Sequence, residues 1–128
     1  MADEKGILWA VPCSPISIKA EYAPVHQHIT LVYGANKADC SEWIGREFFA
    51  VLSRMWTKDG LQATAVMLPR GVKGLCRNKY PHMTLACTEH RKPFESNQLV
   101  EWGVENPGEA TELHIGSGFR IEFFSWTK

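Results

Sequence analysis

The stretch HITLVY, residues His28–Tyr33, is rich in β-branched and aromatic residues and ends at Gly34, a pattern typical of a β-strand. Its first four residues have a counterpart later in the chain, HMTL at residues His82–Leu85. Side chains alternate along a strand, so the histidine and the threonine of each copy share one face while the residue between them points into the core. The repeat therefore predicts two strands that each present an imidazole beside a hydroxyl group.

Further strands are expected on both sides of the repeat. The apolar run Ile7–Val11 and the alternating segment Ile16–Tyr22 precede the first copy, and Gln62–Leu68 precedes the second. Near the C-terminus, Thr111–Ile115 and Phe119–Trp126 are expected to form a hairpin joined through Gly116-Ser117-Gly118.

Two helices are predicted among these strands, a long one from about residue 40 to 57 and a short one over Ser96–Gly103. Asp39 followed by Glu42 resembles an N-cap with its capping-box partner. The apolar stripe of the long helix is formed by Ile44, Phe48, Val51, Leu52 and Met55. Many strands with one or two inserted helices indicate an α+β protein.

The composition is that of an ordinary globular protein and predicts a single domain over residues 1–128. Hydrophobic residues make up 45% of the chain, and 14 Lys and Arg balance 14 Asp and Glu. A balanced charge argues against coating nucleic acid through bulk electrostatics, so any nucleotide contact should be local. The cysteines are expected to be free, partly buried thiols; they are Cys13, Cys40, Cys76 and Cys87.

The expected location is the cytoplasm, with no membrane association. No apolar run approaches the roughly 20 residues that a bilayer-spanning helix needs. The first five residues, MADEK, include acids and lack the basic start and the long apolar run of a signal peptide.

Two copies of the repeat on neighbouring strands place two imidazoles and two hydroxyls around one small volume, which suits a phosphate group. The hydroxyls of Thr30 and Thr84 can donate hydrogen bonds to phosphoryl oxygens. His28 and His82 can act as general base and general acid on opposite sides of phosphorus, and their order stays open. No metal is needed if these donors meet the developing negative charge. The pattern predicts in-line displacement at a phosphodiester, most naturally a strained cyclic one.

A zinc site is an alternative interpretation of the same histidines. His26 and His28 also stand two residues apart and, with His82, would make a three-histidine site. The matched threonines and the absence of a nearby carboxylate ligand favour the phosphate interpretation.

The paired His-x-Thr motifs resemble those of the 2H (two-histidine) phosphoesterase superfamily. The match runs from about Val25 to Leu99 and is most similar to the cyclic phosphodiesterase domain of fungal and plant tRNA ligases. It covers the apolar strand around Ala63–Val66, the segment Cys76–Leu85 with the second motif, and the segment Lys92–Leu99 (KPFESNQL), which leads into the short helix. The chain lacks the GxxxxGK loop and the ligase lysine motif of those enzymes.

The resemblance implies an α+β fold in which two small antiparallel sheets form a pseudo-symmetric, bilobal arrangement and the two motif strands face each other across a cleft. It implies that His28 and His82 are the catalytic pair and that Thr30 and Thr84 bind the substrate phosphate. The implied reaction is hydrolysis of a 2′,3′-cyclic phosphate to a 2′-phosphate and a 3′-hydroxyl, without metal or cofactor.

Several substrates are compatible with that chemistry: an RNA end, a small cyclic nucleotide, or a cyclic or 2′,5′-linked oligonucleotide signal of antiviral defence. A binding module that holds a phosphorylated RNA end without turnover is a further alternative. We expect no obligate protein partner.

Residues near the second motif are candidates for further substrate contacts. Arg70, Lys73 and Arg77 lie in a basic segment that is expected to be a loop and to contact a substrate phosphate. Tyr80 stands two residues before His82 and is a candidate for stacking on a base. Weaker stacking candidates are Trp9, Tyr22 and Phe94; Tyr33 is expected in the core, His26 beside the site, and His90 and His114 at the surface.

Overall fold

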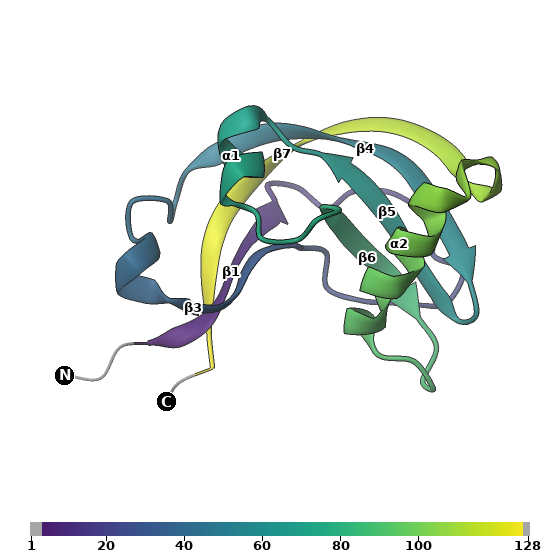
Figure 1. The fold of residues 1–128 in the computed structure, drawn as a ribbon, viewed down its shortest axis with the longest axis horizontal. Helices are drawn as coiled ribbons and strands as arrows, with labels where there is room; N and C mark the ends of the chain where they lie inside the picture. The colour runs from purple at the N-terminus through teal and green to yellow at the C-terminus, as the bar shows by residue number, and fades with distance from the viewer. Residues whose placement is uncertain (1–3, 127–128) are drawn as a thin grey trace.

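The computed structural model describes residues 4–126, in which strands take up 47% and helices 21%. Most of the chain forms one antiparallel sheet that curves around a core (Figure 1). The strands are β1 (Lys5–Pro12), β2 (Ala23–Pro24), β3 (Ile29–Asn36), β4 (Glu47–Lys58), β5 (Leu61–Met67), β6 (His82–Cys87) and β7 (Thr111–Ser125). The helices are η1 (Lys37–Cys40), α1 (Arg70–Leu75), η2 (Pro93–Glu95), α2 (Ser96–Glu105) and η3 (Pro107–Glu109).

The sheet closes into a six-stranded barrel, so the expected pair of separate, pseudo-symmetric sheets is wrong. The strand order is β6-β3-β1-β7-β4-β5, and β5 pairs back with β6 while β2 extends the sheet beyond β6. The reason lies in β7, which pairs with β4 between Thr111 and Arg120 and with β1 between Phe119 and Ser125. A single strand that serves both neighbours joins what would otherwise be two sheets.

The predicted C-terminal hairpin is also wrong, because β7 continues through Gly116-Ser117-Gly118 without a turn. A side chain at position 116 would bring its Cβ to 2.3 Å from the ring of Phe49 on β4. The glycine at this position therefore makes room for a neighbouring aromatic ring and does not mark a chain reversal.

The predicted long helix from residue 40 to 57 is wrong; most of this segment is strand β4. The alternating side chains of Phe48, Ala50 and Leu52 face the main core, and a bulge at Ser53 interrupts the pairing with both neighbours. The bulge reverses the alternation, so Met55 is the next side chain to reach that core. The core-facing residues Leu52 and Met55 are therefore three positions apart, a spacing that also occurs on one face of a helix. Asp39 of the predicted capping signal lies inside the short helix η1, whose cap is Asn36, which accepts from the Ala38 amide.

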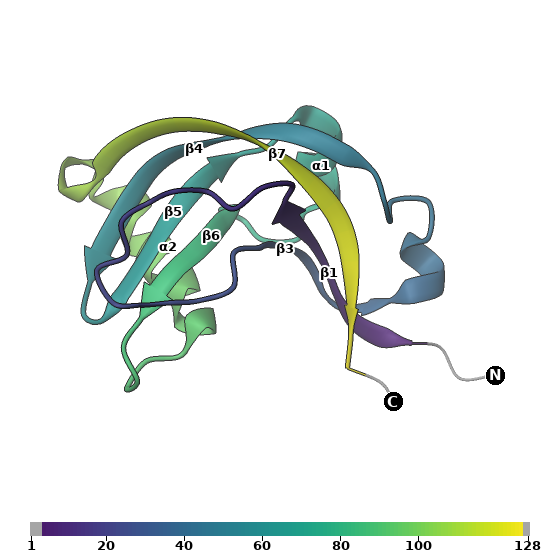
Figure 2. The ribbon, with the colours of Figure 1, turned by 180° about the vertical axis from the view of Figure 1, so that it is seen from behind.

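The predicted strand Ile16–Tyr22 is not formed, because two glutamine side chains take the hydrogen bonds that a neighbouring strand would make. Gln27 donates to the carbonyl and accepts from the amide of Ile16. The fully buried Gln62 accepts from the Glu21 amide and donates to the Lys19 carbonyl. Figure 2 shows this long connection between β1 and β3 on the side of the sheet opposite α2.

Helix α2 confirms the predicted short helix, and it covers β4, β5 and β6 on the outer face of the sheet (Figure 1). Leu99 and Val100 of α2 pack with Trp56 and Leu61 in a second apolar cluster. A Cβ at Gly103 would lie 2.4 Å from the Trp56 ring, so only glycine lets the helix approach this closely. The helix is thereby held with its N-terminal end beside the second motif.

Two further expectations concern cysteines and the membrane. Within residues 4–126, the four cysteines are free thiols, as predicted, although Cys13 is exposed. Over the same residues, no helix combines the length and the apolar character required to cross a membrane. The first three residues, on which the signal-peptide expectation partly depends, lie outside the described part.

Candidate active site

The two His-x-Thr motifs lie side by side in the sheet. Their middle residues, Ile29 of β3 and Met83 of β6, are directly paired, and both are fully buried in the main core. Because the strands are antiparallel, this register sets His28 toward Thr84 and Thr30 toward His82. The motifs are adjacent strands of one sheet and do not face each other across a cleft between two sheets.

All four motif side chains line one cavity of about 340 Å³. Its walls come from β1, β3, β6, the segment before β6, and the N-terminal end of α2 with the preceding turn. The other lining residues are Ile7, Tyr33, Asn78, Pro93, Phe94, Ser96 and Asn97. A space of this size is at the lower end of small-ligand sites in proteins.

Both imidazoles are oriented by the same kind of hydrogen bond. Nδ1 of His28 lies 3.1 Å from the carbonyl oxygen of His26, and Nδ1 of His82 lies 2.8 Å from that of Tyr80. A carbonyl oxygen only accepts, so each Nδ1 carries the hydrogen and donates it. In the neutral ring, Nε2 is then the free base. Each motif therefore fixes the tautomer of its histidine through the carbonyl two residues earlier.

Burial lowers the pKa of both histidines below the ordinary value of 6.5. The hydrogen bond to the backbone opposes this effect in each case by raising the pKa. For His28, the positive charges of His26 and His82 lower the pKa further. The two catalytic candidates thus interact electrostatically, and both favour the neutral form near pH 7.

The hydroxyl of Thr84 is held by a neighbouring serine. Its Oγ1 lies 2.6 Å from Oγ of Ser96, which is 1% exposed, and 3.4 Å from the carbonyl oxygen of Pro93. A carbonyl oxygen only accepts, so Thr84 donates its one hydrogen to Pro93 while Ser96 donates to Thr84. An anion in the cavity would have to take that hydrogen in place of the carbonyl. The hydroxyl of Ser96, the first residue of α2, thus orients a motif residue.

The first motif is tied to the segment that precedes the second. Asn78 donates to the carbonyl oxygen of Thr30 at 3.2 Å, and the Arg77 amide donates to that of Leu31 at 2.8 Å. These bonds hold residues 77 and 78 against β3, although they belong to the chain leading into β6. Asn78 lines the cavity and was not among the predicted residues.

The structure places Tyr80 and the predicted basic residues outside this cavity, whereas Phe94, a weaker stacking candidate, lines it. The ring of Tyr80 packs against the second apolar cluster and receives the Lys79 ammonium, 5.2 Å from its centroid. Only its carbonyl oxygen touches the site, because strand alternation begins at His82. Arg70 and Lys73 are exposed on helix α1, where a loop was expected. Arg77 lines a neighbouring cavity.

Tyr33 was expected in the core but is 74% exposed and lines the cavity. The cause is a bulge in the β1–β3 pairing, where Trp9 pairs with Thr30 and Leu8 pairs with Val32, so Leu31 has no partner. The extra residue reverses the alternation and brings Tyr33 to the face that carries the histidines. Local sequence carries no signal for such a bulge.

Aromatic rings border the first histidine. The Trp9 ring lies 4.4 Å from the ring of His28 and 5.1 Å from that of His26, centroid to centroid. On the other side of the cavity, Phe94 is 69% exposed. Trp9 supports the imidazole from the side, whereas Phe94 and Tyr33 offer open faces for a planar ligand.

The alternative zinc site is not formed. In the described range, no three His, Cys, Asp or Glu side chains gather in an arrangement that could hold a metal ion, and this includes His26, His28 and His82. His26 instead directs Nδ1 at Nδ1 of His28, 3.3 Å away.

Comparison of the sequence with protein-family models and with curated proteins gives no match.

Proposed function

We propose that the protein is a phosphodiesterase of the two-histidine type that opens a 2′,3′-cyclic phosphate at an RNA end or on a small cyclic nucleotide, without a metal or cofactor. The observation that carries the proposal is the antiparallel pairing of the two motifs. It gathers two imidazoles with matched tautomers and two threonine hydroxyls around one small cavity. We place this activity in cytoplasmic RNA processing or repair.

The proposed reaction is an in-line displacement by water. Nε2 of one histidine accepts a proton from water as the water oxygen bonds to phosphorus, and the bond from phosphorus to O3′ breaks. Nε2 of the other histidine, protonated beforehand, gives its proton to O3′. The products are a 2′-phosphate and a 3′-hydroxyl, and a proton exchange with solvent restores the two histidines.

Hydrogen-bond donors around the cavity support the charge that this reaction develops on the non-bridging oxygens. Thr30 and Thr84 supply hydroxyls, and Ser96 holds the second of them. The N-terminal end of α2 meets the cavity at Ser96 and Asn97, where the helix dipole favours an anion. Because these donors act on the phosphate locally, they do not depend on an overall excess of positive charge, and the formal net charge of the chain is 0.

Turnover of a short RNA that ends in a 2′,3′-cyclic phosphate, measured with a chelator present, tests the proposal. We expect a 2′-phosphate product at undiminished rate in the chelator. A cyclic dinucleotide and a cyclic trinucleotide run in parallel identify the alternative substrates. Turnover of those two alone would keep the mechanism and move the substrate to oligonucleotide signals. Binding of the RNA end without turnover of any substrate would contradict the enzyme and favour a binding module.

The pH dependence of kcat/KM should be bell-shaped, with its maximum below pH 6.5. One histidine must be neutral and the other protonated, and burial lowers the pKa of both from 6.5 in the free protein. The rate therefore falls on the alkaline side as the acid loses its proton at a pH below 6.5, and on the acidic side as the base gains one. A bound phosphate favours the imidazolium form, so the kcat profile should lie at higher pH than that of kcat/KM. A kcat/KM that keeps rising through pH 8 would contradict this assignment.

A further inference from the structure

Aromatic side chains form an exposed group on the outer face of the sheet, beside the candidate active site. Tyr33 of β3, Ile7 of β1 and Phe124 of β7 stand in one row across three neighbouring strands, because Ile7 pairs with both of the others. The Trp126 ring, just beyond β7, lies 5.1 Å from the Tyr33 ring, centroid to centroid. The Trp9 ring lies 4.9 Å from the Phe124 ring in the same measure. We call these five residues the aromatic face.

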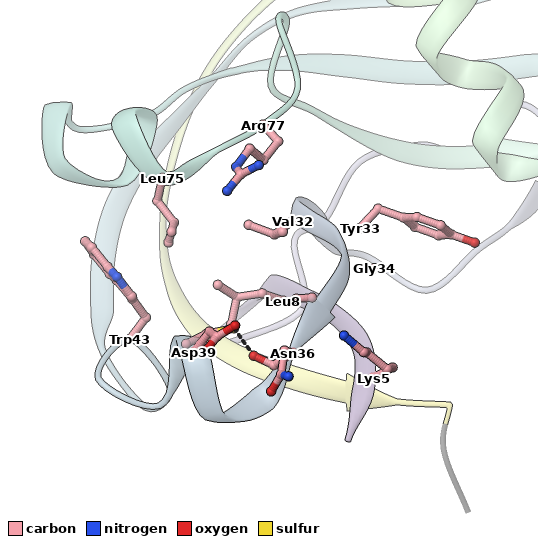
Figure 3. Close-up of a pocket in the computed structure, with 12 residues that line it drawn as sticks. Lys5, Leu8, Val32, Tyr33, Gly34, Asn36, Asp39, Trp43, Leu75 and Arg77 are labelled. Carbon is pink, nitrogen blue, oxygen red and sulfur yellow. Dashed lines mark hydrogen bonds between the residues drawn. The ribbon is translucent and has the colours of Figure 1, made fainter. Parts of the chain in front are cut away.

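The aromatic face continues the surface that carries the motif side chains. Ile7 and Tyr33 belong to it and also line the cavity of the candidate active site. The residues next to them in the sequence, Leu8 and Val32, pack in the main core and line a different cavity, of about 330 Å³, on the inner side of the sheet. Figure 3 shows the Tyr33 ring directed away from that inner cavity. A ligand in the active site can therefore extend over the aromatic face without crossing the sheet.

The rings of the aromatic face are open to a ligand. Tyr33 is 74% exposed, Phe124 46% and Trp126 45%, although each lies in a strand or directly after one. The rings of Tyr33 and Trp126 meet at 56° and do not lie flat on each other, so both keep an open π surface. Contiguous exposed apolar surface is typical of an interaction site. The fold therefore presents several open rings beside a phosphate site.

Nucleotide bases are the ligands that suit such rings. Bases stack on exposed aromatic side chains in proteins that bind single-stranded nucleic acid, with little regard to sequence. All five residues of the aromatic face are uncharged, so this surface suits bases better than phosphates. Because the face adjoins the cavity for the cyclic phosphate, the bases closest to it are those of the same RNA strand.

We propose that the aromatic face binds the nucleotides that precede the cyclic phosphate end, by stacking of their bases on Tyr33, Phe124 and Trp126. This inference rests on the proposed phosphodiesterase and specifies its substrate class as an oligonucleotide end in preference to a cyclic mononucleotide. The continuity of the face with the active-site cavity through Ile7 and Tyr33 carries the inference.

The test compares kcat/KM for a trinucleotide that ends in a 2′,3′-cyclic phosphate with kcat/KM for a 2′,3′-cyclic mononucleotide. We expect the Trp126→Ala variant to lose roughly fivefold or more on the trinucleotide, mainly through KM, because stacking on one ring is lost. Its activity on the mononucleotide should match that of the wild type, since Trp126 does not line the cavity. Phe49→Ala is the matched control: Phe49 is 59% exposed, but it lies on β4 opposite Gly118, away from the aromatic face.

A trinucleotide with abasic sugars at the two positions before the last gives a second readout. Removal of these bases should lower kcat/KM of the wild type, because nothing is left to stack on the rings. The Trp126→Ala substitution should then cause no further loss on this substrate. The phosphates and the cyclic end are unchanged, so the comparison isolates the bases.

Three results would contradict the proposal. An unchanged kcat/KM for the trinucleotide, or an equal loss on both substrates, would overturn the aromatic face as a nucleotide site and leave the phosphodiesterase in place. So would a Trp126→Ala variant with wild-type kinetics and an altered sedimentation coefficient, which would identify the face as a contact between protein chains. Absence of wild-type turnover on both substrates would overturn the phosphodiesterase and this inference with it.

Discussion

Replacing His28 or His82 with alanine is expected to lower kcat for cyclic phosphate hydrolysis by roughly 10²- to 10⁴-fold in each case. Each substitution removes a proton-transfer group whose Nε2 is free and whose Nδ1 is held by a backbone carbonyl. Because KM reports mainly phosphate and nucleotide contacts, it should change far less than kcat. Steady-state kinetics on a short RNA with a 2′,3′-cyclic phosphate measures both quantities.

Controls separate chemistry from folding. His90 is 85% exposed and does not line the candidate active site, so His90→Ala should retain wild-type kinetics. His82 is 9% exposed, and His82→Gln preserves more of its volume than alanine does. Thermal unfolding of each variant verifies that it folds. A folded His28 or His82 variant with wild-type kcat would contradict the assigned roles.

The Trp56→Ala variant should lose about 3–5 kcal/mol of the free energy of unfolding, the range for truncating a large buried aromatic residue. Trp56 is 2% exposed and lies between β4 and helix α2, against Gly103, Leu99 and Val100. A chain of this size has only about 5–15 kcal/mol in total, so the variant should be much less stable. Urea unfolding followed by circular dichroism measures the difference.

Trp126→Ala is the matched control for this prediction. The Trp126 ring is 45% exposed and contacts the exposed Tyr33 ring at a tilted angle, so its removal should cost less than about 1 kcal/mol. Equal losses in the two variants would show that Trp56 does not hold α2 against the sheet. Since α2 carries Ser96 and Asn97 to the cavity, the Trp56→Ala variant should also bind a nucleotide less tightly.

The sequence was sufficient to predict the elements whose pattern is local. The two motif strands, β1, β5 and the short helix were predicted from residue type and alternation, and so was the burial of Ile29 and Met83 between the motif residues. The structure brings His28, His82, Thr30 and Thr84 to one cavity, as strand alternation requires once two such strands are paired.

The remaining errors come from features that depend on distant partners. The bulge at Ser53 converts a two-residue alternation into a three-residue step, and the sequence of β4 alone does not distinguish this from a helix. The bulge at Leu31 brings Tyr33 to the cavity face in the same way. At Gly116, the ring that a side chain would meet belongs to Phe49, which lies far away along the chain.

Accessory residues were predicted less well than motif residues for a related reason. Tyr80 and His82 stand two residues apart, but the strand starts at His82, so alternation does not extend to Tyr80. Ser96 and Asn97 reach the cavity because α2 docks on β5 and β6 through its apolar residues. The position of α2 depends on packing between segments that are distant in the sequence, so it could not be predicted from the spacing of residues within the helix.

The most direct test of the central claim, that both motifs form one phosphate site, is a titration of the histidine ring resonances by nuclear magnetic resonance. We expect His28 and His82 in the free protein to be Nδ1-protonated tautomers at pH 7, as their carbonyl partners require. Addition of a nucleoside 2′-phosphate should shift both rings with one common Kd and leave His90 unchanged. Separate Kd values for the two rings, or a response of only one, would contradict a shared site.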